Sequence, residues 1–391
     1  MTVAYPIAHA WLSTGGTGAQ NYDEFADDAE ITAIIAANPA SALAVEMPHR
    51  APESVGRPFL DCLPDAVDRL RAAKDDGHYA PASDVVVLYR ITAPDGARAY
   101  GLWCMVATDQ ISTSADEPGA VIRNEDVFIE KVRERVALAE ATRHLLSPVL
   151  LLQTAHGEAL HAALAQAVAD AGRPAVTDTD PAGRAHEIWA VGAGTTRDRL
   201  LALAGGGELV VADGNHRSLA AQTAGYERFL AVVTTPESVA IQPYNRLVSE
   251  LPFFEGLTIE PLPGPADVPA VGGRVHLYTR EGSWAATLPK VDGAGVVDNL
   301  DHALVERRLF AEALGLEPGD KRITYVGGDY PAEWLRGEVD AGRAELAVLI
   351  APVTVDDFVA VNLARQKMPR KSTWFTPKAR AGLVVAQLDS V

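Results

Sequence analysis

The stretch from Glu208 to Ala221 constrains the fold of this chain more than any other. Its first part, Leu209 to Ala212, is apolar and partly β-branched, which predicts a buried strand. Good helix formers fill Ser218 to Thr223, and Gly225 follows where helices commonly end. Because Phe229 to Val233 is again apolar, the sequence predicts a β-loop-α-β unit here.

The start of that predicted helix carries five residues that suit phosphate binding: Asp213, Gly214, Asn215, His216 and Arg217. A helix N-terminus offers an anion unpaired backbone N–H groups and the positive end of its dipole. Gly214 lets the backbone approach closely, Arg217 adds a forked cation, and Asp213 can hold a metal ion or a hydroxyl. His216 can bind phosphate or relay a proton. Alternatively, Asp213 and Asn215 only cap the helix, and the last two side chains lie on its solvated face.

Composition excludes several classes of function. A chain of 391 residues with 48% hydrophobic and 22% charged residues is soluble, globular and long enough for two or three domains. Its net charge of -18 argues against a nucleic-acid partner. Two cysteines, Cys62 and Cys104, exclude a disulfide scaffold and a cysteine-based zinc cluster. We find no run of membrane-spanning length and no secretion signal, so we expect a cytoplasmic protein that binds no membrane.

Patterns of strand and helix alternate from about 148 to 235, which indicates an α/β sheet. Upstream, the turn Pro94-Asp95-Gly96 between two apolar runs predicts a hairpin. Two local predictions are a strand over Ala42 to Met47 and a capping box of Thr195 and Asp198 at a helix start.

The segment from Pro252 to Pro269 is rich in Pro and Gly and is the best domain boundary in the chain. We therefore expect an N-terminal α/β region over residues 1–250, with its core at about 148–250. A C-terminal α/β domain over residues 251–391 is expected to close the site.

Cations stand out near the C-terminus of this acidic chain. Met368 to Lys378 combines Arg370, Lys371 and Lys378 with hydroxyl and aromatic side chains. Such a segment suits a loop that closes over a phosphorylated ligand, although a plain surface loop before the last strand explains the composition equally well.

Five stretches of the chain resemble motifs of one known family. They are Asn21-Tyr22-Asp23, Val121-Ile122-Arg123-Asn124-Glu125, Ala212-Asp213-Gly214-Asn215-His216-Arg217, Pro243-Tyr244-Asn245-Arg246-Leu247-Val248 and Met368 to Lys378. In the same order they are similar to Pro-Pro-Tyr-Asp-Val, Arg-His-Glu, Ala-Asp-Gly-His-His-Arg, Pro-x-His-Arg-Leu-Val and Met-Pro-x-Lys-Ser-Thr-Tyr-Phe-x-Pro-Lys. These motifs characterise the bacterial and archaeal family called domain of unknown function 1015. The chain departs from the pattern by carrying Asn in place of His at 124, 215 and 245, and by lacking Pro-Pro before Tyr22.

The Asp-Gly-x-His-Arg signature also resembles that of the ParB/sulfiredoxin-like fold, which includes free-serine kinases, sulfiredoxin and CTP-binding partition proteins. This resemblance implies an α/β fold with mixed α+β sheets, in which a ParB/sulfiredoxin-like nucleotide-binding core is joined by a C-terminal α/β domain. It also implies that residues 213–217 bind nucleotide phosphates. A suspected role of the family in serine metabolism implies an amino-acid substrate.

The first functional hypothesis is a kinase that uses ATP or ADP, or else CTP, with Mg²⁺ to phosphorylate a free amino acid such as serine. Asp213 would bind Mg²⁺ or position the acceptor hydroxyl, and Glu125 or Asp23 would take its proton, with His216 as a further catalytic candidate. The phosphates would be held by Gly214, Asn215, His216, Arg217, Lys371, Ser372, Thr373 and Lys378, and the substrate by Tyr22, Asn124, Asn245 and Arg246. On this hypothesis Asp213→Ala and Arg217→Ala proteins keep their fold and lose turnover.

Two other hypotheses remain open. Loss of three family histidines favours a nucleotide-binding switch or scaffold without turnover. A phosphohydrolase or an ATP-using ligase would need the same phosphate site. The sequence leaves the oligomeric state open, with a homodimer as one option.

Overall fold

The computed structural model describes residues 3–25, 27–112, 119–125, 127, 129–250, 257–317 and 319–388. It has the mixed α/β fold that the sequence predicts, and it divides into two compact units. Unit 1 combines Met1–Val239 with Pro377–Val391, and unit 2 is Ala240–Thr376. The boundary expected after residue 250 therefore falls inside unit 2, and the last residues of the expected C-terminal domain belong to unit 1. The reason is that the last described strand pairs with strands of unit 1.

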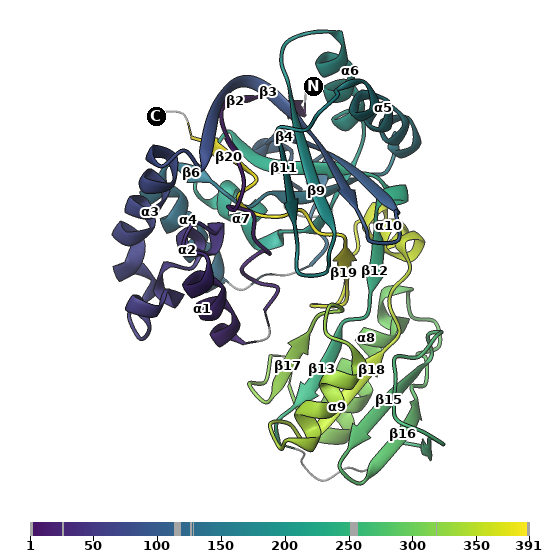
Figure 1. The fold of residues 1–391 in the computed structure, drawn as a ribbon. Helices are drawn as coiled ribbons and strands as arrows, with labels where there is room; N and C mark the ends of the chain where they lie inside the picture. Colours follow the sequence, from purple (N-terminus) through teal and green to yellow (C-terminus); the bar gives the residue numbers. More distant parts are fainter. Residues whose placement is uncertain are drawn as a thin grey trace. The chain divides into compact units, whose positions relative to one another are not determined.

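Twelve strands in the described part of unit 1 form one mixed sheet (Figure 1). Its path runs through β5 (Val121–Ile122), β10 (Leu209–Asp213), β7 (Val149–Gln153), β11 (Arg228–Thr234), β4 (Arg98–Ala107), β3 (Tyr79–Thr92), β2 (Ile7–Ser13), β20 (Val384–Gln387) and β6 (His144–Leu145). Off this path, β1 (Ala4–Tyr5) pairs with β4, and β9 (Ala185–Val191) joins β3 to β8 (Val176–Thr179). The pairs β10–β5 and β11–β7 are parallel, whereas β3 and β4 form the predicted antiparallel hairpin.

Helices of unit 1 fall into two packed groups. They are α1 (Asp28–Ala37), α2 (Ala42–Glu46), α3 (Leu63–Asp75), α4 (Ile129–Thr142), α5 (Gly157–Asp170), α6 (Thr195–Ala204) and α7 (Asn215–Thr223). The helices α5 and α6 pack together, apart from the group α1 to α4 (Figure 1), and α4 packs on α7. The predicted β10-loop-α7-β11 unit is confirmed.

Two local predictions are wrong. Residues 42–46 form α2 instead of a strand, because the Ser41 side chain accepts from Leu43 N (3.4 Å) as an N-cap and Ala, Leu and Glu favour a helix. Thr195 and Asp198 form no capping box, since Gly194 is the N-cap of α6 and Thr195 is already helical.

Strand β3 bends at Asp84 and thereby pairs with different strands along its length. Tyr79–Val85 pairs with β2, whereas Val87–Thr92 pairs with β4 and β9. Asp84 has a φ of +52°, in the left-handed region that Asp tolerates better than most residues. Arg197 of α6 donates to the Asp84 carboxylate (2.7 Å).

Unit 2 is built on an antiparallel sheet of six strands within its described residues. Their order is β14 (Ile259–Pro261), β16 (Gly282–Thr287), β15 (Arg274–Thr279), β18 (Leu346–Ile350), β13 (Asn245–Val248) and β17 (Ile323–Val326). A separate ribbon pairs β12 (Ala240–Gln242) with β19 (Trp374–Thr376). A further helix, α10 (Val355–Leu363), follows β18 in the chain.

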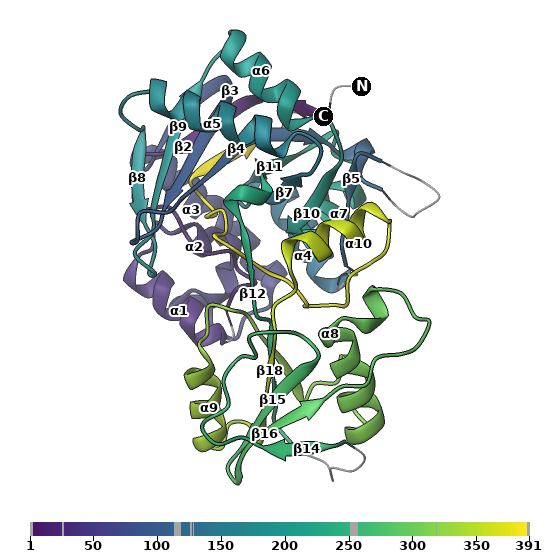
Figure 2. The same ribbon diagram turned by 90° about the vertical axis from the view of Figure 1, so that its right-hand side faces the viewer.

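Helices cover both faces of this six-stranded sheet. Leu346, Val348 and Ile350 of β18 pack in one apolar cluster with α8 (Asp301–Leu304) and the π-helix that continues it over Val305–Leu314. Ala347 and Leu349 pack in another with α9 (Ala332–Asp340). This alternation follows from the two-residue repeat of a strand, and Figure 2 shows α8 and α9 flanking the strands. In neither unit is any described helix both long and apolar enough to span a bilayer.

A glycine pair tests how tightly the segment before β20 packs. Gly382 and Gly225 have nearly equal φ values of +72° and +70°, but a Cβ on Gly382 would lie 2.4 Å from Ala42 Cβ and 2.7 Å from Thr17 O, whereas Gly225 faces open space. We expect Gly382→Ala to lower the free energy of unfolding by about 2–4 kcal/mol and Gly225→Ala by about 1 kcal/mol. Urea denaturation of both variants measures the difference, and equal losses would contradict the packing.

Candidate functional site

Asp213, the last residue of β10, forms ion pairs with two buried cations of unit 1, Lys378 and Arg217. Lys378 Nζ lies 2.7 Å from its Oδ1, and Arg217 Nη2 lies 2.5 Å from its Oδ2. The three side chains are only 7–15% exposed. Burial by itself raises the pKa of Asp213, but the charges of Lys378 and Arg217 outweigh it and the pKa is lowered. Asp213 is therefore a fixed carboxylate at neutral pH.

Gly214 makes this arrangement possible. Its φ of +99° turns the chain from β10 into α7, and a Cβ there would lie 3.1 Å from Arg217 Nε and 3.2 Å from Val149 Cα. The glycine thus gives room to the returning Arg217 side chain, which also donates to Pro148 O. As the N-cap of α7 it supplies no side-chain hydrogen bond to the first helical turn.

This geometry excludes the simple capping alternative for residues 213–217. Neither Asp213 nor Asn215 is the N-cap residue of α7. His216 and Arg217 are 5% and 8% exposed, so they do not lie on a solvated face.

Asn21 and Glu24 complete the cluster from the N-terminal segment. Asn21 Nδ2 donates to Glu24 Oε1 (2.8 Å) and lies 3.5 Å from Asp213 Oδ2, while its Oδ1 accepts from Arg217 Nη1 (3.3 Å). Burial raises the pKa of Glu24 to about 7, and the Asp213 and Asp23 charges add to this although Lys378 opposes it. Sequence reasoning missed Glu24, whose one signal is its place directly after the Asn21-Tyr22-Asp23 motif.

Two other residues of that motif lie beside the cluster. Asp23 acts on Asp213 as a like charge that opposes its ionisation. Tyr22 is buried, with the Arg135 guanidinium 4.1 Å from its ring centroid, and burial raises its pKa. Both positions therefore neighbour the charged groups, which is compatible with the roles expected of them.

Asn124 and Asn215 contact each other. Asn215 Nδ2 donates to Asn124 Oδ1 (2.5 Å), and Asn124 N donates to Asn215 Oδ1 (3.3 Å). The parallel pairing of β5 with β10 brings these two chain positions together. Two of the three departures from the family's histidine pattern are therefore one linked, buried change. Glu125, the next residue, is only partly buried.

The remaining candidates, Asn245, Arg246, Lys371, Ser372 and Thr373, belong to unit 2. Asn245 Oδ1 accepts from Ile350 N (3.0 Å), and the fully buried Arg246 lies 3.3 Å from Glu306 Oε1. Ser372 is buried, and Lys371 Nζ lies 5.6 Å from the Tyr244 ring centroid. The expected phosphate clamp is thus divided: Lys378 is in unit 1 beside Asp213, whereas 371–373 are in unit 2.

The motifs that meet at Asp213 are those of a single family. The family model described as protein of unknown function DUF1015 matches residues 17–303, and the chain belongs to this family. No curated protein matches the chain.

Several solved structures show partial similarity to this chain. Free serine kinase in complex with AMP is 11% identical, with a TM-score of 0.39 over 70% of this chain and 87% of that one. SbnI with a C-terminal truncation, from Staphylococcus aureus, is 13% identical, with a TM-score of 0.40 over 71% and 84%. A conserved hypothetical protein from Pyrococcus furiosus is 12% identical, with a TM-score of 0.38 over 72% and 95%.

Because Asp213 and its two cations are buried together, we expect substitution of Asp213 to lower the stability of the protein. Asp213→Asn leaves Arg217 and Lys378 buried without a carboxylate, so we expect the free energy of unfolding to fall by about 3–5 kcal/mol. Asp198→Asn is the control, because Asp198 pairs with Arg197 while 66% exposed and should cost under about 1 kcal/mol. Urea denaturation compares them, and a fully stable Asp213→Asn protein would contradict the strength of the pair.

Glu24 should make stability depend on pH with a definite sign. The folded pKa of about 7 exceeds the ordinary value of 4.5, so between these values the folded protein binds more protons than the unfolded chain. Stability relative to Glu24→Gln should therefore fall as pH rises from about 4.5 to 7, by about 3 kcal/mol in all, and then stay constant. Urea denaturation of both proteins from pH 5 to 8 measures this, and a pH-independent difference would rule out the shift.

Proposed function

We propose that unit 1 binds nucleotide phosphates at the start of α7 and transfers a phosphoryl group to the hydroxyl of a small molecule, a free amino acid such as serine. One observation carries the proposal. Asp213, Arg217, Lys378 and Glu24 form a buried cluster at the start of a helix whose N-cap, Gly214, has no side chain.

The helix start and the cations would position the phosphates. The backbone N–H groups of a helix N-terminus and the positive end of the helix dipole attract an anion placed at the start of α7. Arg217 and Lys378 are already oriented by Asp213, so little side-chain entropy remains to be lost when an anion binds. Phosphoryl transfer depends chiefly on such positioning and charge neutralisation.

Glu24 is the best placed general base. With a pKa of about 7, its carboxyl can both accept and release a proton near neutral pH. The acceptor hydroxyl would pass its proton to Glu24 as its oxygen bonds to phosphorus, while the bond from phosphorus to the nucleotide's leaving oxygen breaks. Glu24 takes the place of Glu125 and Asp23 in this role because it is hydrogen-bonded into the cluster through Asn21.

Mg²⁺ fits this site only as a partner of the nucleotide. Within the described ranges, no group of three or more His, Cys, Asp or Glu side chains could hold a metal ion. Nucleotide-bound Mg²⁺ needs only one or two protein carboxylates in addition to phosphate oxygens. Asp23 and Asp213 repel each other electrostatically, and a divalent cation beside them would relieve that repulsion and neutralise phosphate charge.

A second function, nucleotide binding without turnover, is favoured by the Asn124–Asn215 contact. Both positions are His in the family pattern, and here they are hydrogen-bonded to each other. If those histidines transfer protons in the family, an amide pair cannot replace them, because neither amide titrates near neutral pH.

Nucleotide binding is tested by the melting temperature of the full chain with Mg²⁺ and ATP, ADP, CTP or GTP. We expect one nucleotide at saturation to raise Tm by about 3 °C or more, since ligand at a hundred times Kd adds about 2.7 kcal/mol. No rise with any of the four would overturn both functions.

Turnover is tested with Glu24→Gln. With L-serine and other hydroxyl amino acids as acceptors, phosphorus NMR should detect a phosphorylated product, and Glu24→Gln should lower kcat about 10²–10⁴-fold while the nucleotide still raises Tm. Glu158→Gln, at an exposed position of α5, is the matched control and should turn over normally. Binding with no product would favour the second function, and an active Glu24→Gln protein would exclude Glu24 as the base.

A further inference from the structure

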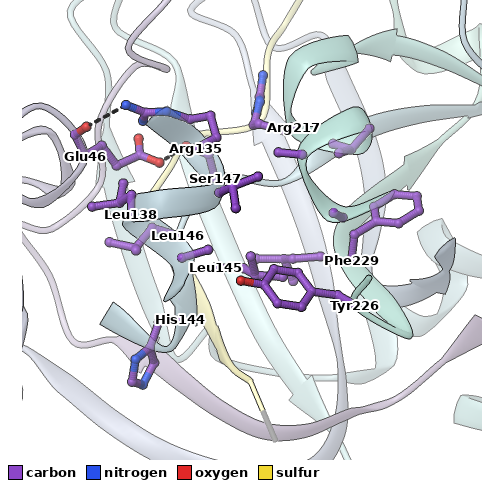
Figure 3. A pocket seen from close by; sticks show the side chains of 16 residues that line it. Glu46, Arg135, Leu138, His144, Leu145, Leu146, Ser147, Arg217, Tyr226 and Phe229 are labelled. Carbon is purple, nitrogen blue, oxygen red and sulfur yellow. Dashed lines mark hydrogen bonds between the residues drawn. The ribbon is translucent and has the colours of Figure 1, made fainter. Parts of the chain in front are cut away.

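Unit 1 contains a cavity of about 50 Å³ next to α4 and α7. Figure 3 shows Glu46, Arg135 and Ser147 gathered at one end. Leu138, Leu146 and Phe229 are among the apolar side chains that line the rest. The cavity is therefore rich in polar groups at one end, while His144, Tyr226 and Arg217 are further polar residues in an otherwise apolar wall.

The guanidinium of Arg135 has unused donors. Arg135 is 7% exposed, and its Nη2 donates to Glu46 O (3.1 Å). Its Nε and Nη1 have no hydrogen-bond partner within the described part of the chain. Aromatic rings flank the group, with the centroids of Tyr22 and Phe59 at 4.1 and 5.1 Å. Those rings stabilise the cation but accept no conventional hydrogen bond from it.

Glu46 offers an unused acceptor at the same end. It is 3% exposed, and Ser147 Oγ donates to its Oε1 (2.6 Å). Its Oε2 has no hydrogen-bond partner within the described ranges. No ion pair between the side chains of Glu46 and Arg135 is found among the described residues. Burial raises the pKa of Glu46, although the charge of Arg135 opposes this shift. An acidic and a basic side chain thus border one cavity without satisfying each other, which is costly unless a third group bridges them.

The size and lining of the cavity restrict what the bridging group can be. A water needs about 10–15 Å³ of such space, so the cavity holds the equivalent of about three to five waters. Water would satisfy the polar end but is disfavoured along the apolar wall. A molecule of few non-hydrogen atoms, charged at one end and apolar at the other, matches both parts.

We propose that this cavity binds a small α-amino acid as its zwitterion. Nε and Nη1 of Arg135 and Oε2 of Glu46 are themselves buried, so both side chains would turn toward the cavity as the ligand enters. The carboxylate would then accept from Nε and Nη1 of Arg135, whose fork suits a carboxylate. The ammonium group would donate to Glu46 Oε2, and the short side chain would extend along the wall formed by Leu138 and Phe229. Arg217 also lines the cavity; its guanidinium holds Asp213 and so joins this site to the charged cluster. The proposal concerns binding alone and does not depend on phosphoryl transfer.

Isothermal titration calorimetry of the full chain without nucleotide tests the site. Glycine, L-alanine and L-serine are compared with propionate and propylamine, which each lack one of the two charges. At least one amino acid should bind with a Kd of about 1 mM or tighter, and both single-charge compounds should bind at least tenfold more weakly, because each leaves one buried group unpaired. Absence of binding by all three amino acids, or equal binding of propionate, would overturn the proposal.

Cavity filling separates the site from general effects on folding. Ala139 of α4 lines the cavity and is 6% exposed, so Ala139→Leu should raise Kd at least tenfold without removing a charge. Ala141→Leu, at an exposed position of the same helix, should bind as the wild type does. Unchanged affinity in a folded Ala139→Leu protein would place the binding elsewhere and overturn the proposal. Because nucleotide is absent, failure here leaves the melting experiment with nucleotides unaffected.

Discussion

The arrangement of unit 1 depends most on the two ion pairs of the Asp213 carboxylate. Asp213 ends β10 and holds Arg217 from the first turn of α7 and Lys378 from the segment before β20. Arg217 in turn contacts Asn21 and the carbonyl of Pro148. Segments distant in sequence therefore meet at one ion cluster. A charge buried in this way is stable only while its partners stay in place, so the cluster favours one mutual position of these segments over all others.

The same cluster moves the pKa values of two carboxyl groups in opposite directions. Asp213 contacts both cations directly, and its pKa is lowered although it is buried. At Glu24 the effect of burial on the pKa exceeds the opposing effect of the Lys378 charge, so the pKa is raised. Environments that separate two carboxyl groups in this way are typical of sites where one carboxyl stays charged and the other exchanges protons. The opposite shifts arise because Asp213 contacts Lys378 and Arg217 directly, whereas burial is the largest effect on the pKa of Glu24.

Local patterns predicted the fold where they were unambiguous. The apolar run before Asp213, the glycine after it and the following helix formers predicted the β10–α7 unit, and the Pro94-Asp95-Gly96 turn predicted the hairpin of β3 and β4. The run 42–47 failed because a short apolar segment of Ala, Leu and Val suits either a buried strand or a buried helix. Glu24 could not be found in this way, since the charges that act on its pKa include those of Asp213 and Lys378, which are more than 180 positions away in the sequence. Residues 213–217 and Lys378 were chosen for their chemistry, but only the fold shows that Arg217 and Lys378 share one carboxylate.

The pairing of β20 with β2 and β6 has a consequence for biosynthesis. A ribosome releases residues 3–239 first, then all of unit 2, and only afterwards the strand that lies between β2 and β6 in the sheet of unit 1. Until residue 378 has emerged, Asp213 also lacks one of its two cations. Unit 1 therefore cannot complete its sheet, or pair Asp213 with both cations, until more than a hundred further residues, Ala240–Thr376, have been made. Unit 2, which is continuous in sequence, is free to fold during that interval.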